Sequence, residues 1–154
     1  MWLKTFWVYL VLFLLAGCTS GRKTATLDDL YTREVRFPDG AIYRAEVATK
    51  PYDMTRGLMF RESLAADRGM LFIYGSVGEG YKVWTYNNRF PVDAIWLDQN
   101  RLITEIVPAI APCKSESANG CPFFGGSTRS LYVLELNAGV AAKHNLKPGD
   151  RLSF

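Results

Sequence analysis

The sequence predicts a mainly β fold, either an antiparallel β-sandwich or a partly open barrel, with two short helices. Stretches rich in β-branched and aromatic residues recur at short spacing, and Gly, Pro or Asn stands between them. Turn residues at 38–40 and 98–100 join two pairs of these stretches, so residues 92–107 form the clearest hairpin. We expect strands at residues 32–37, 41–48, 70–74, 81–86, 92–97, 102–107, 130–136 and 151–154.

Two short helices are expected between the strands. The first starts at Pro51 and runs to about Met59, because Pro suits the first turn and Asp53 faces unpaired amides there. The second covers Ala138 to about His144, with Asn137 as its N-cap.

The first 17 residues have the three parts of a bacterial lipoprotein signal peptide. Lys4 is the basic part, residues 6–15 are all apolar or aromatic, and residues 15–18 (LAGC) match the lipobox. The apolar run is shorter than the roughly 20 residues that a spanning helix needs. We expect cleavage before Cys18 and a lipid on its thiol, which would anchor the protein to a membrane. An uncleaved anchor or an ordinary signal peptide is the alternative.

Residues 18–30 are polar and predict a flexible tether, and residues 31–154 predict a single domain. Thr19 follows the cysteine where aspartate would favour inner-membrane retention, so we expect the periplasmic side of the outer membrane. The formal net charge is +3, and it falls to +2 when Lys4 is removed with the signal. No cluster of four basic residues occurs, so nucleic acid is not an expected partner.

Two cysteines, Cys113 and Cys121, remain after lipidation of the first. In an oxidising compartment such a pair predicts a disulfide, while a redox or metal role is the competing interpretation. The one histidine, His144, lies far along the chain and is expected to have a surface or capping role. No cofactor and no metal site are therefore expected.

Seven segments occur in a characteristic order between residues 46 and 154. They are 56–61 (RGLMFR), 69–72 (GMLF), 83–88 (VWTYNN), 91–96 (PVDAIW), the Pro-Cys…Cys-Pro loop, 133–139 (VLELNAG) and 147–151 (KPGDR). Together they resemble the family known as DUF192 or COG1430. The resemblance implies a compact β-rich domain, often exported, with no established activity. Tyr86 stands where the family has a lysine, so we expect no role here for that ammonium group.

Glu135 is the most informative candidate for a functional side chain. Alternation along its strand places it on one face with Leu131 and Val133, and both faces are apolar, so we expect a half-buried carboxylate. Because a buried carboxylate without a partner is costly, we expect an ion pair with Arg56 or Arg61. A structural ion pair, the charge of a ligand pocket and a general base all remain open.

Asp93 and the amides before it form a second group of candidates. Asp93 follows Pro91 at the start of a strand, and Asn87 and Asn88 can cap or pair the preceding turn. An Asp, an Asn and an Arg that converge near one strand end could bind a sugar or another polar metabolite. They could equally satisfy the backbone of the loops.

Five aromatic residues could form a platform for a carbohydrate or a peptide, namely Trp84, Tyr86, Trp96, Phe123 and Phe124. Aromatic residues in strands more often belong to the core, which we expect for Trp96. Phe123 and Phe124 lie in the cysteine loop, so they either plug one end of the fold or face a partner.

No nucleophile elbow, phosphate-binding glycine loop or HExxH motif occurs, so no catalytic set is recognisable. The leading hypothesis is a lipid-anchored binding module for a small polar ligand or an envelope partner. Its candidate ligand contacts are Arg56, Arg61, Asn87, Asp93 and Glu135. The alternative is an envelope hydrolase or carbohydrate-active enzyme in which Asp93 and Glu135 act as a carboxylate pair.

Overall fold

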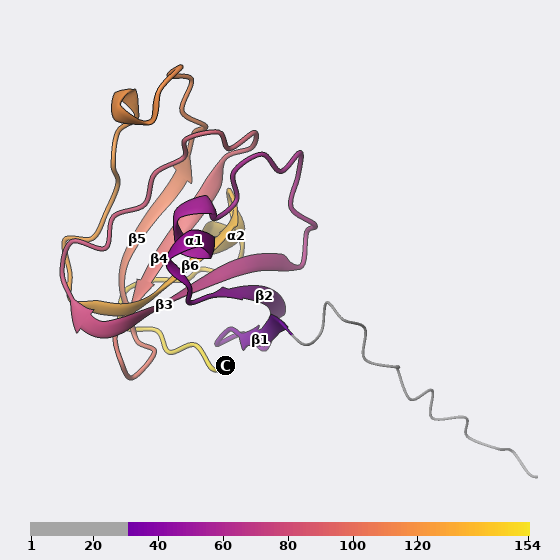
Figure 1. The fold of residues 1–154 in the computed structure, drawn as a ribbon. Helices are drawn as coiled ribbons and strands as arrows, with labels where there is room; N and C mark the ends of the chain where they lie inside the picture. The colour runs from indigo at the N-terminus through magenta and orange to yellow at the C-terminus, as the bar shows by residue number, and fades with distance from the viewer. Residues whose placement is uncertain (1–30) are drawn as a thin grey trace, which may run out of the picture.

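The computed structural model describes residues 31–154, in which six strands form one open sheet (Figure 1). The strands are β1 (Thr32–Arg36), β2 (Ile42–Ala48), β3 (Arg68–Gly78), β4 (Val92–Leu97), β5 (Ile103–Ile110) and β6 (Ser130–Asn137). Their order is β1-β2-β3-β6-β4-β5, and every neighbouring pair is antiparallel except β2 and β3. The prediction of a mainly β fold is confirmed, with a mixed sheet that does not close into a barrel. The predicted signal peptide, Cys18 and the tether lie outside the described residues.

The two predicted turns form through side chains that accept backbone hydrogen bonds. Asp39 Oδ1 accepts from the amide of Ala41 at 3.0 Å, which closes the β1–β2 hairpin. Asp98 Oδ1 accepts from the amides of Asn100 and Leu102 at 2.7 and 2.9 Å, which closes the β4–β5 hairpin. Both aspartates therefore supply the local bonds that make these positions turns.

Both helices are shorter than predicted. The first, α1 (Pro51–Arg56), ends where Gly57 takes a positive φ of 46°. The second, α2 (Val140–Lys143), begins after Gly139, so the predicted N-cap role of Asn137 is wrong. The Asn137 side chain instead donates to the carbonyls at residues 64 and 65, which ties the end of β6 to the loop before β3. None of the helices within residues 31–154 is long and apolar enough to cross a membrane.

Two predicted strands, at residues 81–86 and 151–154, do not form ladders. Segment 81–86 pairs only through single bridges, from Val83 to Phe124 and from Tyr86 to Cys113, because its neighbours are loops and not strands. The last residues bridge to the chain just before β5 and to the end of β1. This C-terminal segment thus links the two edges of the sheet at one end.

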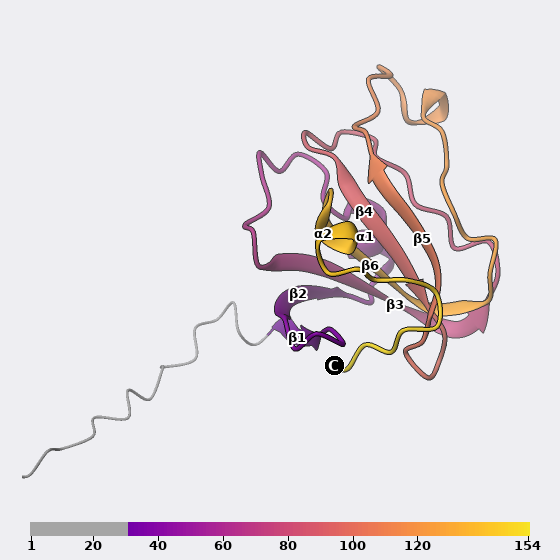
Figure 2. The ribbon, with the colours of Figure 1, turned by 180° about the vertical axis from the view of Figure 1, so that it is seen from behind.

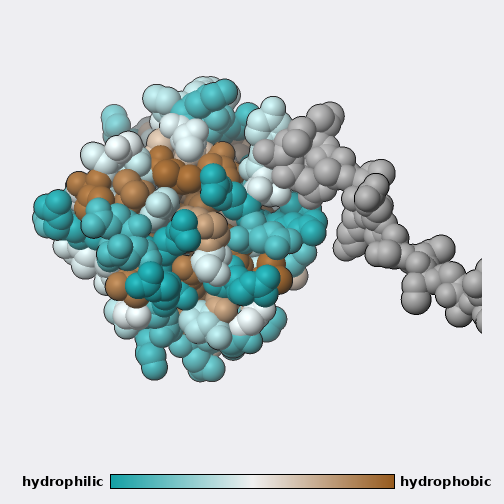
Figure 3. Space-filling view, turned by 90° about the horizontal axis from the view of Figure 1, so that it is seen from below, coloured by the Kyte–Doolittle hydropathy of each residue, from teal (hydrophilic) through white to brown (hydrophobic). Residues whose placement is uncertain are grey.

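The sheet carries a hydrophobic core on each face, with one helix on each side (Figures 1 and 2). Alternation along β4 sends Ala94 and Trp96 to the face covered by α1 and Ile95 and Leu97 to the face covered by α2. We call these the α1 face and the α2 face. Seen from below, the surface is mainly hydrophilic, with apolar side chains in small groups (Figure 3).

Candidate functional site

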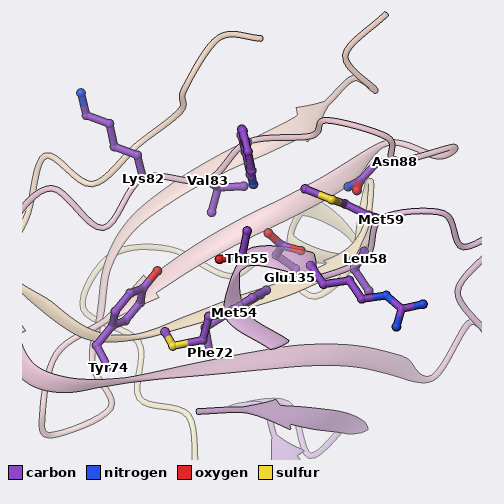
Figure 4. A pocket seen from close by; sticks show the side chains of 13 residues that line it. Met54, Thr55, Leu58, Met59, Phe72, Tyr74, Lys82, Val83, Asn88 and Glu135 are labelled. Carbon is purple, nitrogen blue, oxygen red and sulfur yellow. The ribbon is translucent and has the colours of Figure 1, made fainter. Parts of the chain in front are cut away.

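Glu135 lies in the middle of the sheet, and its side chain enters the core of the α1 face. It is opposite Met70 of β3 and Ala94 of β4 in the two registers, and only 5% of it is exposed. The carboxyl group faces a cavity of about 60 Å³, which we call the Glu135 cavity (Figure 4). Its lining comes from α1 and the turn after it, from β3, and from residues 82–88: Met54, Thr55, Arg56, Gly57, Leu58, Met59, Phe72, Tyr74, Lys82, Val83, Trp84 and Asn88.

The Glu135 carboxyl group has no hydrogen bond or ion pair with any of the described residues. Burial therefore raises its pKa from 4.5 to about 8, and no neighbouring charge opposes that rise. The ion pair predicted for Glu135 is thus absent. Sequence alternation predicted a half-buried side chain with a partner, whereas the structure buries it almost completely and provides no partner among the described residues.

Neither of the two arginines expected to pair with Glu135 forms that ion pair. Arg61 forms a two-pronged pair with Glu46 of β2, with N–O distances of 2.5 and 2.8 Å. This pair lies in a separate surface hollow together with Arg68. Arg56 lines the Glu135 cavity, but its side chain is exposed at the end of α1. Arg61 is unavailable because β2 brings Glu46 closer to it than β6 brings Glu135.

Apart from the exposed Arg56 and Lys82, the other polar groups that line the cavity are uncharged. Asn88 is 8% exposed, and its amide lies on the same side of the cavity as Met59 (Figure 4). Tyr74 stacks on Tyr81 with ring centroids 3.6 Å apart, and burial, the Glu135 charge and Tyr81 together raise the pKa of Tyr74 to about 12. Thr55 adds a hydroxyl group from α1. The cavity therefore combines apolar walls with one carboxyl group and a few neutral hydrogen-bonding groups.

Asn87 does not line the cavity, although it was predicted as a ligand contact and Asn88 was not. Asn87 adopts a left-handed conformation with a φ of 56°, and its carbonyl accepts from the amide of Phe60 at 2.9 Å. Its role is to form the turn that places Asn88. Sequence reasoning also missed Tyr74, whose position on the face of Glu135 follows only once β3 is known to neighbour β6.

Asp93 lies on the opposite face of the sheet from Glu135. It is opposite Leu136, which belongs to the core of the α2 face, whereas Glu135 is opposite Ala94 of the α1 face. Asp93 is fully buried, and its two oxygens accept from the amides of Ala109 and Ala141, each at 2.8 Å. A carboxylate pair across an open cleft, as a glycosidase needs, is therefore not formed by these two residues.

The bond between Cys113 and Cys121 agrees with the predicted disulfide, with an S–S distance of 2.03 Å. It closes the loop of residues 113–121, and Phe123, two residues beyond Cys121, stacks on Trp84 with ring centroids 5.8 Å apart. Phe123 is 59% exposed, whereas Phe124 packs against the core of the α1 face. Within residues 31–154, no group of three or more His, Cys, Asp or Glu side chains is placed to hold a metal ion.

The remaining aromatic candidates have structural contacts. Trp96 is fully buried, as expected, and its indole N–H donates to the carbonyl of Tyr81 at 2.6 Å. His144 is more than a surface residue, because its Nδ1 lies 2.7 Å from Asp39 and its Nε2 lies 3.0 Å from the hydroxyl of Tyr43. These contacts join α2 to the β1–β2 hairpin on the α2 face, away from the Glu135 cavity.

Comparison with known proteins places the chain in a family. The family described as "Uncharacterized ACR, COG1430" (DUF192) matches residues 35–154. A crystal structure from Novosphingobium aromaticivorans DSM 12444, of a protein of unknown function, is similar with a TM-score of 0.66 and 28% identity. That match covers 80% of this chain and 84% of the other.

A second crystal structure, from Sinorhizobium meliloti 1021 and described as a candidate transcription regulator, has a TM-score of 0.64 and 30% identity. That match covers 78% of this chain and 89% of the other. A comparison with curated proteins found no match. The family match extends over almost all of the described sheet, and the chain belongs to the DUF192 (COG1430) family.

Proposed function

We propose that this protein is a lipid-anchored envelope protein that binds a small polar ligand in the Glu135 cavity. One observation carries the proposal. The carboxyl group of Glu135, a residue that is only 5% exposed, faces a cavity and has no partner among the described residues. A purely structural carboxyl group at such a site is normally paired, because its desolvation is otherwise uncompensated.

The size of the cavity supports a small ligand over an envelope protein as the occupant. On the scale of about 10–15 Å³ for each water molecule, 60 Å³ holds a few waters or one small functional group. The mixture of apolar walls with a few polar groups is also typical of small-molecule sites. A ligand that supplied hydrogen bonds to Glu135 would replace the partner that the chain lacks.

The ligand site is tested by a thermal-shift screen of small polar metabolites on the full-length protein in detergent. We expect at least one compound to raise the unfolding temperature of the wild type but not of Glu135→Gln. Glu79→Gln is the matched control, because Glu79 is exposed in the loop after β3. A compound that stabilises Glu135→Gln as well as it does the wild type would place binding elsewhere.

The membrane anchor is supported by the lipobox that ends at Cys18. We expect the full-length chain to incorporate radiolabelled fatty acid in bacteria and to sediment with membranes. Cys18→Ser should not incorporate the label, because the thiol that accepts the diacylglycerol is absent. A Cys18→Ser protein that is labelled like the wild type would refute lipidation at this residue.

A further inference from the structure

We infer that the Glu135 cavity takes the head of a protonated monoamine with an apolar body, whose ammonium group donates hydrogen bonds to Glu135 and Asn88. This inference rests on the proposed function and names the class of ligand. Its basis is the distribution of charge in the cavity, the shape of the cavity, and the apolar hollow next to it.

The cavity has one carboxyl group that no basic side chain pairs with. Glu135 is its acidic lining residue, and the lining residues Thr55, Tyr74 and Asn88 add neutral hydrogen-bonding groups. The two basic lining residues are exposed at the rim, and the amine of Lys82 points away from Glu135 (Figure 4). Charge-assisted hydrogen bonds from a cation are the strongest partners for a buried carboxylate. An ammonium group on the ligand therefore supplies the charged hydrogen-bond donor that the described part of the chain does not provide for Glu135.

The shape of the site separates a polar head from an apolar body. The cavity has room for an ammonium group and its first carbon atoms, against the side chains of Leu58 and Phe72. A second hollow of about 380 Å³ shares Thr55, Arg56 and Met59 with the cavity, so the two lie next to each other. This outer hollow is completed by two exposed aromatic residues, Tyr52 and Phe60. An amine whose head reaches Glu135 would lay its apolar body on this surface.

Arg56 lines both the cavity and the outer hollow. A second positive charge on the body of the ligand would lie near this guanidinium group and would be repelled. The site should thus favour a monoamine over a diamine of similar length.

Binding of a cation should also release a proton. Because burial raises the pKa of Glu135 to about 8, the empty site holds a proton at neutral pH, and an ammonium group must displace it. Below about pH 8, affinity should therefore increase about tenfold for each pH unit. The other ionisable groups that line the cavity with Glu135 are Arg56 of α1, Tyr74 of β3 and Lys82, and none of them is a histidine or a second carboxyl group.

The test is calorimetric titration of the full-length protein in detergent at pH 6, 7 and 8. The probes are 2-phenylethylamine, its neutral counterpart 2-phenylethanol, and 1,5-diaminopentane. We expect the monoamine to bind at least tenfold more tightly than the other two at pH 8. Its affinity should fall about fivefold from pH 8 to pH 7 and about tenfold from pH 7 to pH 6. Glu135→Gln should lose both the affinity and the pH dependence, and Glu79→Gln should keep both.

The possible failures separate the two proposals. If 2-phenylethanol binds as tightly as the amine and still requires Glu135, the ligand class is wrong and the pocket proposal stands. If the affinity for the amine falls as the pH rises, the protonated acid is the binding form. The ligand class is then wrong and the pocket proposal stands. If neither these probes nor the metabolite screen shows any binding that Glu135→Gln removes, both proposals are wrong.

Discussion

Replacement of Glu135 by glutamine should stabilise the protein, and the gain should grow with pH. Glutamine has nearly the same shape, so the packing against Phe72 and Tyr74 is kept while the ionisable group is lost. In the wild type, the carboxyl group has a pKa of about 8 when folded, against the ordinary value of 4.5. The unfolded chain therefore binds fewer protons than the folded chain between these two values, and wild-type stability falls as pH rises.

The magnitude follows from the separation of the two pKa values. Below about pH 4.5 both states are protonated, and this group makes no difference to the free energy of unfolding. At pH 7 the cost to the wild type is about 3 kcal/mol, since each pH unit above 4.5 contributes about 1.4 kcal/mol. Above about pH 8 the cost levels off near 5 kcal/mol, because the folded state then ionises as well.

Urea unfolding of the ligand-free protein at pH 5, 7 and 9 measures this effect. The difference between Glu135→Gln and the wild type should be below about 1 kcal/mol at pH 5 and about 3 kcal/mol at pH 7. Glu79→Gln controls for the loss of a surface charge and should change little at any pH. A difference that is independent of pH, or a glutamine variant less stable throughout, would show that Glu135 has a partner and would refute this reasoning.

Three further substitutions test the contacts that support the fold. Asp93→Asn should lose about 1–3 kcal/mol in urea unfolding, because one of the two backbone amides that Asp93 binds loses its acceptor; an unchanged midpoint would contradict this. Replacing Cys113 and Cys121 together by serine should lower the unfolding free energy by about 2.5 kcal/mol, for a sequence separation of 8 residues. Equal stability of this variant and the wild type under non-reducing conditions would show that the bond is dispensable. Gly125→Ala should yield little folded protein by circular dichroism, because its Cβ would lie 2.3 Å from the Trp96 ring at a φ of +62°; a native spectrum would refute that clash.

Local sequence signals predicted the elements that depend on neighbouring residues. The two hairpin turns follow from Asp39 and Asp98, each of which accepts hydrogen bonds from amides within four residues of it. The pairing of Cys113 with Cys121 follows from an even number of cysteines close together in the sequence. The burial of Glu135 was visible in the apolar residues on both faces of its strand.

Segments that need distant partners were predicted less well. Residues 81–86 have the composition of a strand, but they pair with the loop that contains Phe124 and not with a strand. Composition describes how well a segment suits a pleated surface, and it does not say whether a second strand will be available.

The sequence by itself determined the β class, the turns, the disulfide pair and the resemblance to the family, because each depends on residues that are close together or on a pattern along the chain. Only the tertiary structure decided which side chains meet. Alternation along one strand assigns its residues to one face or the other. Which side chains of different strands then lie together depends on the strand order β3-β6-β4 and on the parallel pairing of β2 with β3. That order pairs Arg61 with Glu46, sends Asp93 to the opposite face, and leaves Glu135 without a partner beside a cavity.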